Sequence, residues 1–453
     1  MDNMVKIISG ERIMKKILMI LIMIVMILNF FCGASFASSK KNFRENSCIV
    51  DNIDEALWQK TVEIYLKDDL WTEQNAYDAC HYLMVPMHAA FLLRKYEWEE
   101  QFNTHFLRFL EAYQNGNAIV EGRLNRLHYF YLMSRFLALS LNSNNYGILQ
   151  KELQKILYDE IEILWTKDPA WMWGKKPFIG GMRERFAWKF SGAKLPYSYC
   201  KAVIDEELFV FSIAADLRSI ERVVKTRATW SPLISDILDA AYDVFKKESS
   251  FLSDDGWLFQ IGVWADHGDY AYVGHLQKGT NLEPKPLRDV SSDVSHSHRF
   301  PLWILSLRDA YESSDEEYQY YEKVRKGLAK QFTEKVLIPP SNVFQAYRTT
   351  NFMDGRNGIY RWNYKTQGPN NGYGPYELSG TFMLGWWAFC GSKIIDDSYG
   401  EMVKAFPLSE RIISVYTGPN TTRERHSLVK FPDFFKNGYS ELLVRLASKM
   451  PVF

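Results

Sequence analysis

Cysteine is scarce in this sequence, and the cysteines form no recognisable pattern. Only 5 of the 453 residues are Cys, and none belongs to a CxxC or CxH pair. This spacing excludes a dense disulfide framework and a zinc site of the usual kind. A single disulfide stays open for the four cysteines beyond the N-terminal apolar segment.

An excess of either charge is also missing. Lys plus Arg and Asp plus Glu both number 54, so no general electrostatic field favours nucleic acid or a strongly acidic surface. We therefore expect no nucleic-acid partner, and any anionic ligand has to be bound by a local cluster of side chains.

The familiar cofactor, metal and nucleophile motifs are absent too. The sequence has no GxGxxG after a strand, no GxxxxGK[ST], no GxSxG, no HExxH and no EF-hand loop. These absences remove the usual signals for nucleotides, for a serine nucleophile and for two common metal sites. We predict no cofactor, and no metal is required.

The N-terminus carries the clearest single signal that is present. Two lysines follow Met14, an apolar run extends from Ile17 to Phe31, and Ala-Ser-Phe-Ala precedes a polar segment. This is the anatomy of a secretory signal peptide. We expect a signal peptide over residues 1–37, a flexible segment over 38–50 and a secreted or cell-surface protein. An uncleaved membrane anchor is the alternative, and no other membrane contact is predicted.

Beyond residue 50 the pattern is helical. Apolar residues recur at spacings of three and four, and strand-like alternation is scarce. Segments that are apolar nearly all round alternate with amphipathic segments rich in Lys and Glu, as at 150–164, 236–248 and 316–331. No stretch resembles a linker, so we predict one all-α domain over 51–453. The alternation favours an α/α toroid of five or six helical hairpins, with an inner and an outer ring of helices.

Long loops rich in Trp, Tyr and Gly separate some of these helices. They cover 166–198, 251–294 and 343–376. Loops of this length are functional or disordered, and their aromatic content argues against disorder. We expect them to lie together over one mouth of the toroid. Aromatic residues make up 15% of the chain, and flat aromatic faces suit stacking on sugar rings as well as core packing.

The stretch RDVSSDVSHSHRFPLW at 288–303 crowds polar groups at a predicted helix start. Ser292 or Asp293 would cap a helix that reaches about Tyr311, with Pro301 in its first turn. His296, His298 and Arg299 would then lie close to the incoming loop. The structural alternative is that Asp293 is only a cap while one histidine fills the core and the other faces water.

Further polar residues occur in apolar surroundings. Asp78, His81 and His88 share one helix face through spacings of three and seven. Burying three ionisable groups is costly unless they line a wet cavity. We therefore expect a cleft, and the residues predicted to bind substrate in it are Arg299, Arg183, Glu184, His81, Asp78, Asp269, His267, Trp264, Asp354, Arg356 and Tyr373.

Two sugar chemistries fit such a cleft. Hydrolysis needs a pair of carboxylates, which Asp266, Asp269, Glu184, Asp293 or Asp354 would supply. β-Elimination at a uronic acid needs a group that neutralises the substrate carboxylate, a base and an acid. The local mixture of His, Arg, Tyr and Asn suits elimination better, and the catalytic candidates are His296, His298, Tyr270, Tyr272 and Asp293.

Two short pieces carry a family resemblance. DDGWLFQ at 254–260 and YAYVGH at 270–275 are similar to the DGSFxQH and YxGxYG pieces of chondroitin lyases, with Trp257 where that family has Ser. The chain thus resembles the α/α-toroid polysaccharide lyases of the alginate and chondroitin types. The resemblance implies that Tyr270 or Tyr272 is a base or an acid with His296 or His298 as its partner. It also implies that Arg299 and Arg183 neutralise the substrate carboxylate.

These inferences give one expected function and two alternatives. We expect a secreted enzyme that cleaves a polysaccharide or oligosaccharide by β-elimination at uronic acid residues. A toroidal glycoside hydrolase with an Asp/Glu pair shares the expected architecture and is the first alternative. A non-catalytic glycan-binding or surface protein is the second.

Overall fold

The computed structural model describes residues 50–118, 122–143, 145–173, 177–192, 194–224, 231–419 and 424–451. All of them belong to one compact unit. The predicted signal peptide (1–37) and all but the last residue of the predicted flexible segment (38–50) lie outside the described residues. The unit is mostly helical, with few short strands, which confirms the predicted all-α class.

Four helices form the interior of the unit. They are α4 (Glu73–Leu92), α6 (Arg123–Asn142), α9 (Asp205–Val224) and α12 (Phe300–Asp309). Each is buried around most of its circumference, as the nearly continuous apolar segments predict. Along the chain each of these helices packs against the next.

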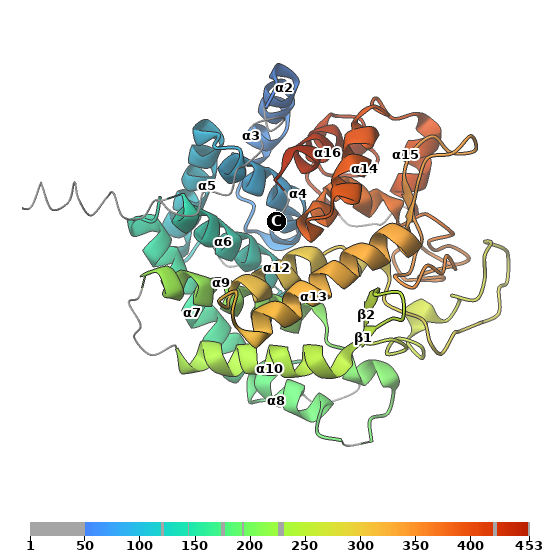
Figure 1. The fold of residues 1–453 in the computed structure, drawn as a ribbon, viewed down its shortest axis with the longest axis horizontal. Coiled ribbons are helices and arrows are strands. Elements are labelled where there is room, and N and C mark those ends of the chain that lie inside the picture. Colours follow the sequence, from blue (N-terminus) through green and yellow to red (C-terminus); the bar gives the residue numbers. More distant parts are fainter. Residues whose placement is uncertain are drawn as a thin grey trace, which may run out of the picture. The chain divides into compact units, whose positions relative to one another are not determined.

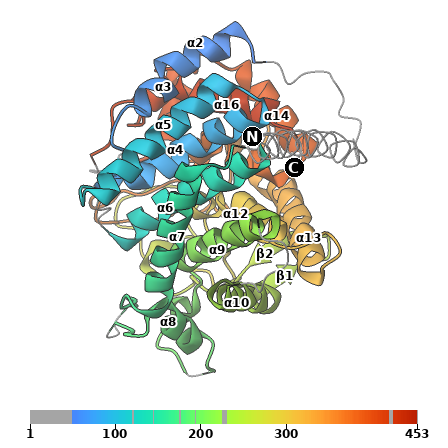
Figure 2. The same cartoon turned by 90° about the vertical axis from the view of Figure 1, so that its left-hand side faces the viewer.

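Each interior helix is followed by an amphipathic helix that packs on its outer side. These partners are α5 (Tyr96–Gln114), α7 (Ile148–Thr166), α10 (Pro232–Glu248) and α13 (Glu316–Gln331). One face of each is buried, and the Lys and Glu side chains of the other face are exposed. Figures 1 and 2 show the four partners outside the four interior helices. The predicted alternation of buried and exposed helices is therefore confirmed.

The two ends of the described chain pack together. Near its start lie α2 (Asn52–Lys60) and α3 (Val62–Tyr65), and near its end lie α14 (Lys393–Val403), α15 (Glu410–Thr417) and α16 (Tyr439–Lys449). Helix α16 contacts α2, α4 and α14. Arg445 and Lys449 of α16 form ion pairs with the buried carboxylate of Asp54 in α2.

The segment 376–395 is apolar nearly all round, yet it does not form one continuous helix. It forms two short 3₁₀-helices, η4 (Ser379–Leu384) and η5 (Trp386–Cys390), before α14 begins. Gly385 between them has a φ of 80°, and a Cβ there would lie 3.1 Å from Val85 and 3.2 Å from Ala447. The close approach of α4 and α16 therefore requires glycine in a left-handed conformation, and that conformation ends a helix. Through η5 the interior path continues, because η5 contacts both α12 and α16.

Short elements interrupt the three predicted loops. The first loop contains α8 (Gly181–Lys189) and η1 (Ser198–Lys201), and the second contains η2 (Gly268–Tyr270). Two antiparallel hairpins occur: β1 (Ser249–Phe251) pairs Ser250 with Leu258 of β2 (Trp257–Phe259), and β3 (Leu337–Ile338) pairs with β4 (Arg348–Thr349). The remaining short elements are α11 (Val294–Ser297), η3 (Phe332–Val336) and η6 (Asp433–Phe435).

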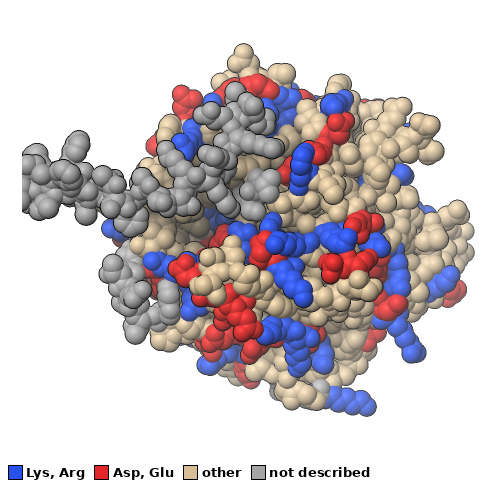
Figure 3. Space-filling model, viewed as in Figure 1, with Lys and Arg blue, Asp and Glu red and all other residues tan. Residues whose placement is uncertain are grey.

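The surface has no excess of either charge on the face in view (Figure 3), and three of the cysteines are free. Figure 3 shows acidic and basic side chains interspersed on the face in view. Cys80, Cys200 and Cys390 are buried free thiols. In the part of the chain that the structure describes, every helix is too short or too polar to span a bilayer.

Candidate functional site

A cavity of about 290 Å³ opens where the N-terminal ends of α6, α9 and α12 meet the long loops. Each of the three predicted loops contributes to it. The first supplies Trp171 and Trp173, the second supplies Trp264, His267, Asp269 and Tyr270, and the third supplies Tyr360 and Arg361. The expectation that the loops meet over one site is thus met at this cavity.

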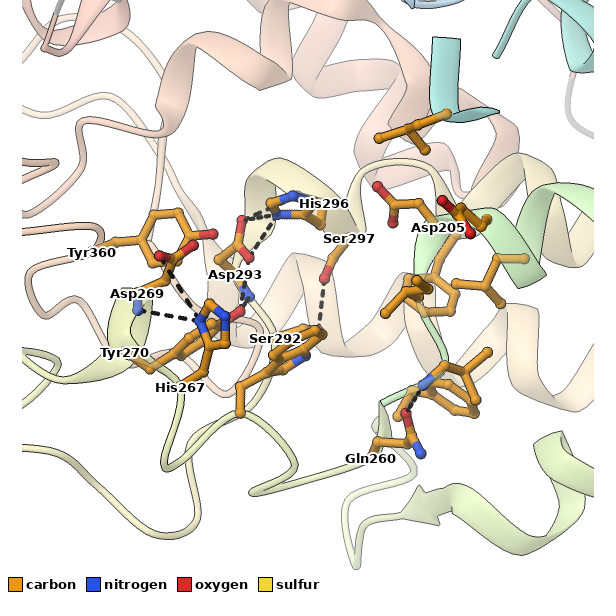
Figure 4. Close-up of a pocket in the computed structure, with 18 of the residues that line it drawn as sticks. Asp205, Gln260, His267, Asp269, Tyr270, Ser292, Asp293, His296, Ser297 and Tyr360 are labelled. Carbon is orange, nitrogen blue, oxygen red and sulfur yellow. Dashed lines mark hydrogen bonds and ion pairs between the residues drawn. The ribbon is translucent and has the colours of Figure 1, made fainter. Parts of the chain in front are cut away.

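Asp293 and His296 form an oriented pair on the cavity wall (Figure 4). Asp293 caps α11 and accepts the backbone N–H of His296 at 3.1 Å. The helix predicted to run from this cap to about Tyr311 is broken into α11 and α12. The same carboxylate lies 2.9 Å from Nδ1 of His296. Because a carboxylate accepts hydrogen bonds, this contact assigns the proton to Nδ1 and leaves Nε2 as an acceptor. The His296 side chain is 36% exposed, so it can meet a ligand.

Asp293 stays ionised in this position. Burial alone would raise the pKa of its carboxyl, but the neighbouring His296 and the hydroxyl of Ser295 hold that pKa well below its usual range. Tyr270 adds a hydrogen bond, donating its hydroxyl to Asp293 Oδ2 at 2.8 Å and accepting the Asp293 N–H at 3.1 Å. A buried phenol beside a carboxylate is hard to ionise, and the pKa of Tyr270 is raised well above its ordinary value. Tyr270 therefore remains a neutral phenol, and its role is to hold the Asp293 carboxylate in place.

His267 has the opposite tautomer on the same cavity. Its Nδ1 accepts the backbone N–H of Asp269 at 3.2 Å, which leaves the proton on Nε2. The nearest carboxylate oxygen of Asp269 is 3.9 Å from Nδ1, too far for a hydrogen bond. Burial lowers the pKa of His267, and Asp269 offsets part of that effect. The neutral ring thus offers an N–H donor, whereas His296 offers an acceptor.

Arg361 brings a positive charge to this wall. Its Nε donates to Asp269 at 2.8 Å, and its backbone N–H donates to the Asp269 carbonyl at 3.0 Å. Within the described residues its two Nη groups make no hydrogen bond. The backbone φ of Arg361 is 54°, a left-handed conformation that is costly for a residue with a Cβ. The fold holds this guanidinium at the cavity despite local strain.

Every carboxylate that lines the cavity has a positive partner or a histidine. Asp205 lies 2.6 Å from Arg299, and Glu206 lies 2.8 Å from Arg185. Asp269 pairs with Arg361 and Asp293 with His296, as described above. All four carboxylates are thus engaged with a neighbouring guanidinium or imidazole.

Three of the predicted site residues, Arg299, His81 and His298, form a buried cluster beside the cavity, and a fourth, Asp78, is buried next to Arg425 instead. Arg299, which is 2% exposed, donates to His81 Nε2 at 3.1 Å, to Asp205 at 2.6 Å and to the Tyr77 hydroxyl at 2.9 Å. The ring centroid of His298 lies 5.4 Å from that of His81. Asp78 lies 3.5 Å from Arg425. None of these four (Arg299, His81, His298 and Asp78) lines the cavity.

The remaining predicted residues divide between the cavity and other surfaces. Trp264 lines the cavity and stacks on Tyr270 with ring centroids 5.9 Å apart. Tyr373 lines a separate, smaller cavity of about 110 Å³. The predicted residues that line neither cavity and are not among the four buried residues are Tyr272, Arg183, Glu184, Asp354 and Arg356.

Comparison with known proteins adds no assignment. Neither a family model, nor a curated protein, nor a solved structure matches the chain. Within the described ranges, no group of three or more His, Cys, Asp or Glu side chains is arranged to hold a metal ion.

Several cavity residues were not predicted from the sequence. Asp205 and Glu206 begin α9, and acidic residues in a first turn usually read as simple helix caps. Arg361 follows Tyr360 in a loop without any motif. Trp171 and Trp173 lie in a loop already noted as aromatic, and that aromatic content was the one usable signal for them.

Proposed function

We propose that this protein is a secreted enzyme that cleaves a polysaccharide by β-elimination at uronic acid residues. Two features support the proposal: the predicted signal peptide, and a cavity lined by groups that can serve as a base, an acid and a cation. The similarity of DDGWLFQ and YAYVGH to chondroitin lyase pieces points in the same direction, and Gln260 of the first piece and Tyr270 of the second both line the cavity.

We also propose an α/α-toroid architecture. Its support is the order of packing contacts, which runs from α4 through α6, α9, α12, η5 and α16 and returns to α4. A helical solenoid would leave its first and last repeats apart. The outer helices α5, α7, α10 and α13 follow the interior helices as the second member of each hairpin.

In the proposed reaction His296 is the base. Its Nε2 takes the proton from the carbon next to the uronate carboxyl group, and the C–H electrons form a carbon–carbon double bond. The bond from the neighbouring carbon to the glycosidic oxygen breaks, and His267 Nε2–H donates a proton to that oxygen. The imidazolate left at His267 and the imidazolium at His296 then return to the neutral form by proton exchange with water. Asp293 stabilises the imidazolium formed at His296. Protons and electrons balance without a metal or a redox partner.

Arg361 completes the proposed site. A guanidinium that faces the uronate carboxylate neutralises its charge and stabilises the negative charge that develops when the proton leaves. A hydrolase would need a protonated carboxyl group with a raised pKa. Asp293 does not meet this requirement, because its pKa is held well below the usual range. The two imidazoles that line the cavity support elimination instead.

The observation that carries the proposal is the pair of opposite tautomers, His296 with a free acceptor and His267 with a free donor on one cavity. The test is incubation of the purified protein with alginate, hyaluronan and chondroitin while the ultraviolet absorbance of the new conjugated double bond is followed. We expect a rise with at least one polymer, and a rate about 10²- to 10⁴-fold lower for His296→Ala. His275→Asn, a histidine outside the cavity, is the matched control and should keep the wild-type rate.

Two outcomes would replace this proposal. Reducing ends that appear on a neutral glycan without any absorbance change would identify a hydrolase. Glycan binding by the wild-type protein, with no product from any polymer or neutral glycan, would identify a binding protein.

A further inference from the structure

A row of aromatic rings leads away from the cavity. Trp173 and Trp264 line the cavity with ring centroids 6.1 Å apart. Trp173 also lies 5.2 Å from Trp171 and 5.2 Å from Tyr199. Tyr199 stacks on Tyr197 at 5.0 Å with an angle of 7° between their planes. We call these five residues the aromatic lane.

Two members of the lane are open to solvent. Trp171, on the cavity wall, is 50% exposed, and Tyr197, at the far end of the lane, is 52% exposed. Exposed apolar surface that is continuous with a cavity often marks a site that contacts a ligand or a partner. Core packing does not account for the exposed rings of Trp171 and Tyr197. We therefore expect a bound molecule to cover them.

Polar contacts hold the backbone of the lane in place. The fully buried guanidinium of Arg185 donates to the Trp171 carbonyl at 2.9 Å and forms an ion pair with Glu207 at 2.9 Å. The Asp266 carboxylate accepts the backbone N–H of Ser198, between the two tyrosines, at 2.8 Å. The exposed rings are thus fixed before any ligand arrives, which reduces the entropy lost on binding.

We propose that the aromatic lane is a binding surface for the sugar units that flank the cleaved uronic acid residue. This inference rests on the proposed function for the identity of the ligand. The apolar C–H face of a pyranose ring matches a flat aromatic side chain, and the lane is continuous with the cavity through Trp173 and Trp264. Its five side chains carry no charge, whereas Arg361 lies inside the cavity. Negative charge is therefore recognised at the cleaved residue, and the flanking units are recognised by their ring faces.

The experiment separates binding from cleavage. His296→Ala, which does not turn over, is run by affinity gel electrophoresis in gels that contain alginate or hyaluronan. The same measurement follows in that background for Trp171→Ala, for Tyr197→Ala and for Tyr96→Ala. Tyr96 is the matched control, because it is an exposed aromatic residue, 71% exposed, on α5.

We expect each lane variant to bind the retarding polymer about fivefold to tenfold more weakly. The loss should be the same at low and high NaCl, since stacking does not depend on charge. Tyr96→Ala should keep the parent affinity. Equal affinity of parent and lane variants, or no retardation in either polymer, would overturn the lane.

The two proposals fail in different ways. If wild-type protein releases no unsaturated product but the lane variants still lose polymer affinity, the elimination chemistry is wrong and the lane stands. If wild-type protein cleaves a polymer and the lane variants bind and cleave it as the parent does, the lane is wrong and the chemistry stands.

Discussion

His296 and His298 are two positions apart, yet they occupy different environments. His296 lies on the cavity, with Nδ1 against Asp293 and a side chain that is 36% exposed. His298 is 2% exposed, its Nδ1 lies 2.7 Å from the Ser295 carbonyl, and its buried Nε2 has no hydrogen-bond partner among the residues that the structure describes. The break between α11 and α12 at His298 and Arg299 separates the two rings.

The difference shows that the carboxylate partner and the exposure decide what an imidazole can do. An oriented, accessible ring is suited to proton transfer. The buried rings of His81, His128 and His298 surround Arg299, and burial, followed by the charge of Arg299, lowers the pKa of each well below its usual range. They are neutral members of the structural framework.

The largest expected difference between the two regions is catalytic. His296→Ala should lower kcat by about 10²- to 10⁴-fold, because the base is lost. Its Tm should fall less than that of His298→Ala, because the His296 side chain is partly exposed and Tyr270 and Ser295 still hydrogen-bond the Asp293 carboxylate. His298→Ala should show the reverse pattern, with a lower Tm and a smaller loss of kcat. Parallel rate and unfolding measurements check this, and a lower Tm for His296→Ala than for His298→Ala would contradict the assignment.

Arg299→Met should give the largest loss of stability. The variant leaves Asp205, Tyr77 and His81 without their shared donor, and breaking a buried ion pair costs about 3–5 kcal/mol of unfolding free energy. Urea denaturation measures the change. Arg183→Met is the control, because the Arg183 side chain is 62% exposed and pairs with Asp236 at the surface, where at most about 1 kcal/mol is expected. Similar losses for both variants would refute a special role of the buried cluster.

Stability should fall on acidification because of the buried histidines. A histidine whose folded-state pKa is lowered contributes stability that is complete above its unfolded pKa of about 6.5 and is lost as the pH falls towards the folded value. Each buried ring that stays neutral should therefore lower the free energy of unfolding by about 1.4 kcal/mol for every pH unit below 6.5. Denaturation curves between pH 7 and 5 should show a shallower dependence for His128→Phe and an unchanged one for His275→Asn. An identical slope in the wild type and His128→Phe would disprove the assignment.

The smallest expected effect concerns the support of Asp293. Tyr270→Phe removes one hydrogen bond to that carboxylate and should cost about 1 kcal/mol of stability and about tenfold in kcat. Tyr272→Phe should leave both unchanged, because Tyr272 does not line the cavity. If Tyr272→Phe were inactive and Tyr270→Phe active, Tyr272 and not Tyr270 would be the residue that matters for catalysis.

Local patterns in the sequence were sufficient for much of the fold. The three- and four-residue apolar spacing identified the helices, and the difference between wholly apolar and amphipathic segments identified which are interior. Asp293 was recognisable as a cap because a carboxylate before the first turn satisfies free backbone N–H groups. Gly385 was not recognisable as a helix break, since its conformation is required by Val85 and Ala447, which are distant in sequence.

The site was predicted in part. Trp264, His267, Asp269, Tyr270, Asp293 and His296 do meet at one cavity. The prediction wrongly added four buried residues to this group: His81, Asp78, His298 and Arg299. Helical spacing shows which side chains share a helix face, but it does not show whether other segments cover that face. Arg361 and Asp205 were missed, since each becomes notable only beside a partner, Asp269 or Arg299, far away in the chain.

The sequence by itself determined the helical class, the alternation of interior and outer helices and the polar cap at 293, because these depend on residues within a few positions of one another. Only the tertiary structure decided which histidines face the cavity, which tautomer each one has and which carboxylates are paired. Those properties depend on hydrogen bonds and burial between distant segments, and residue order along the chain does not specify either.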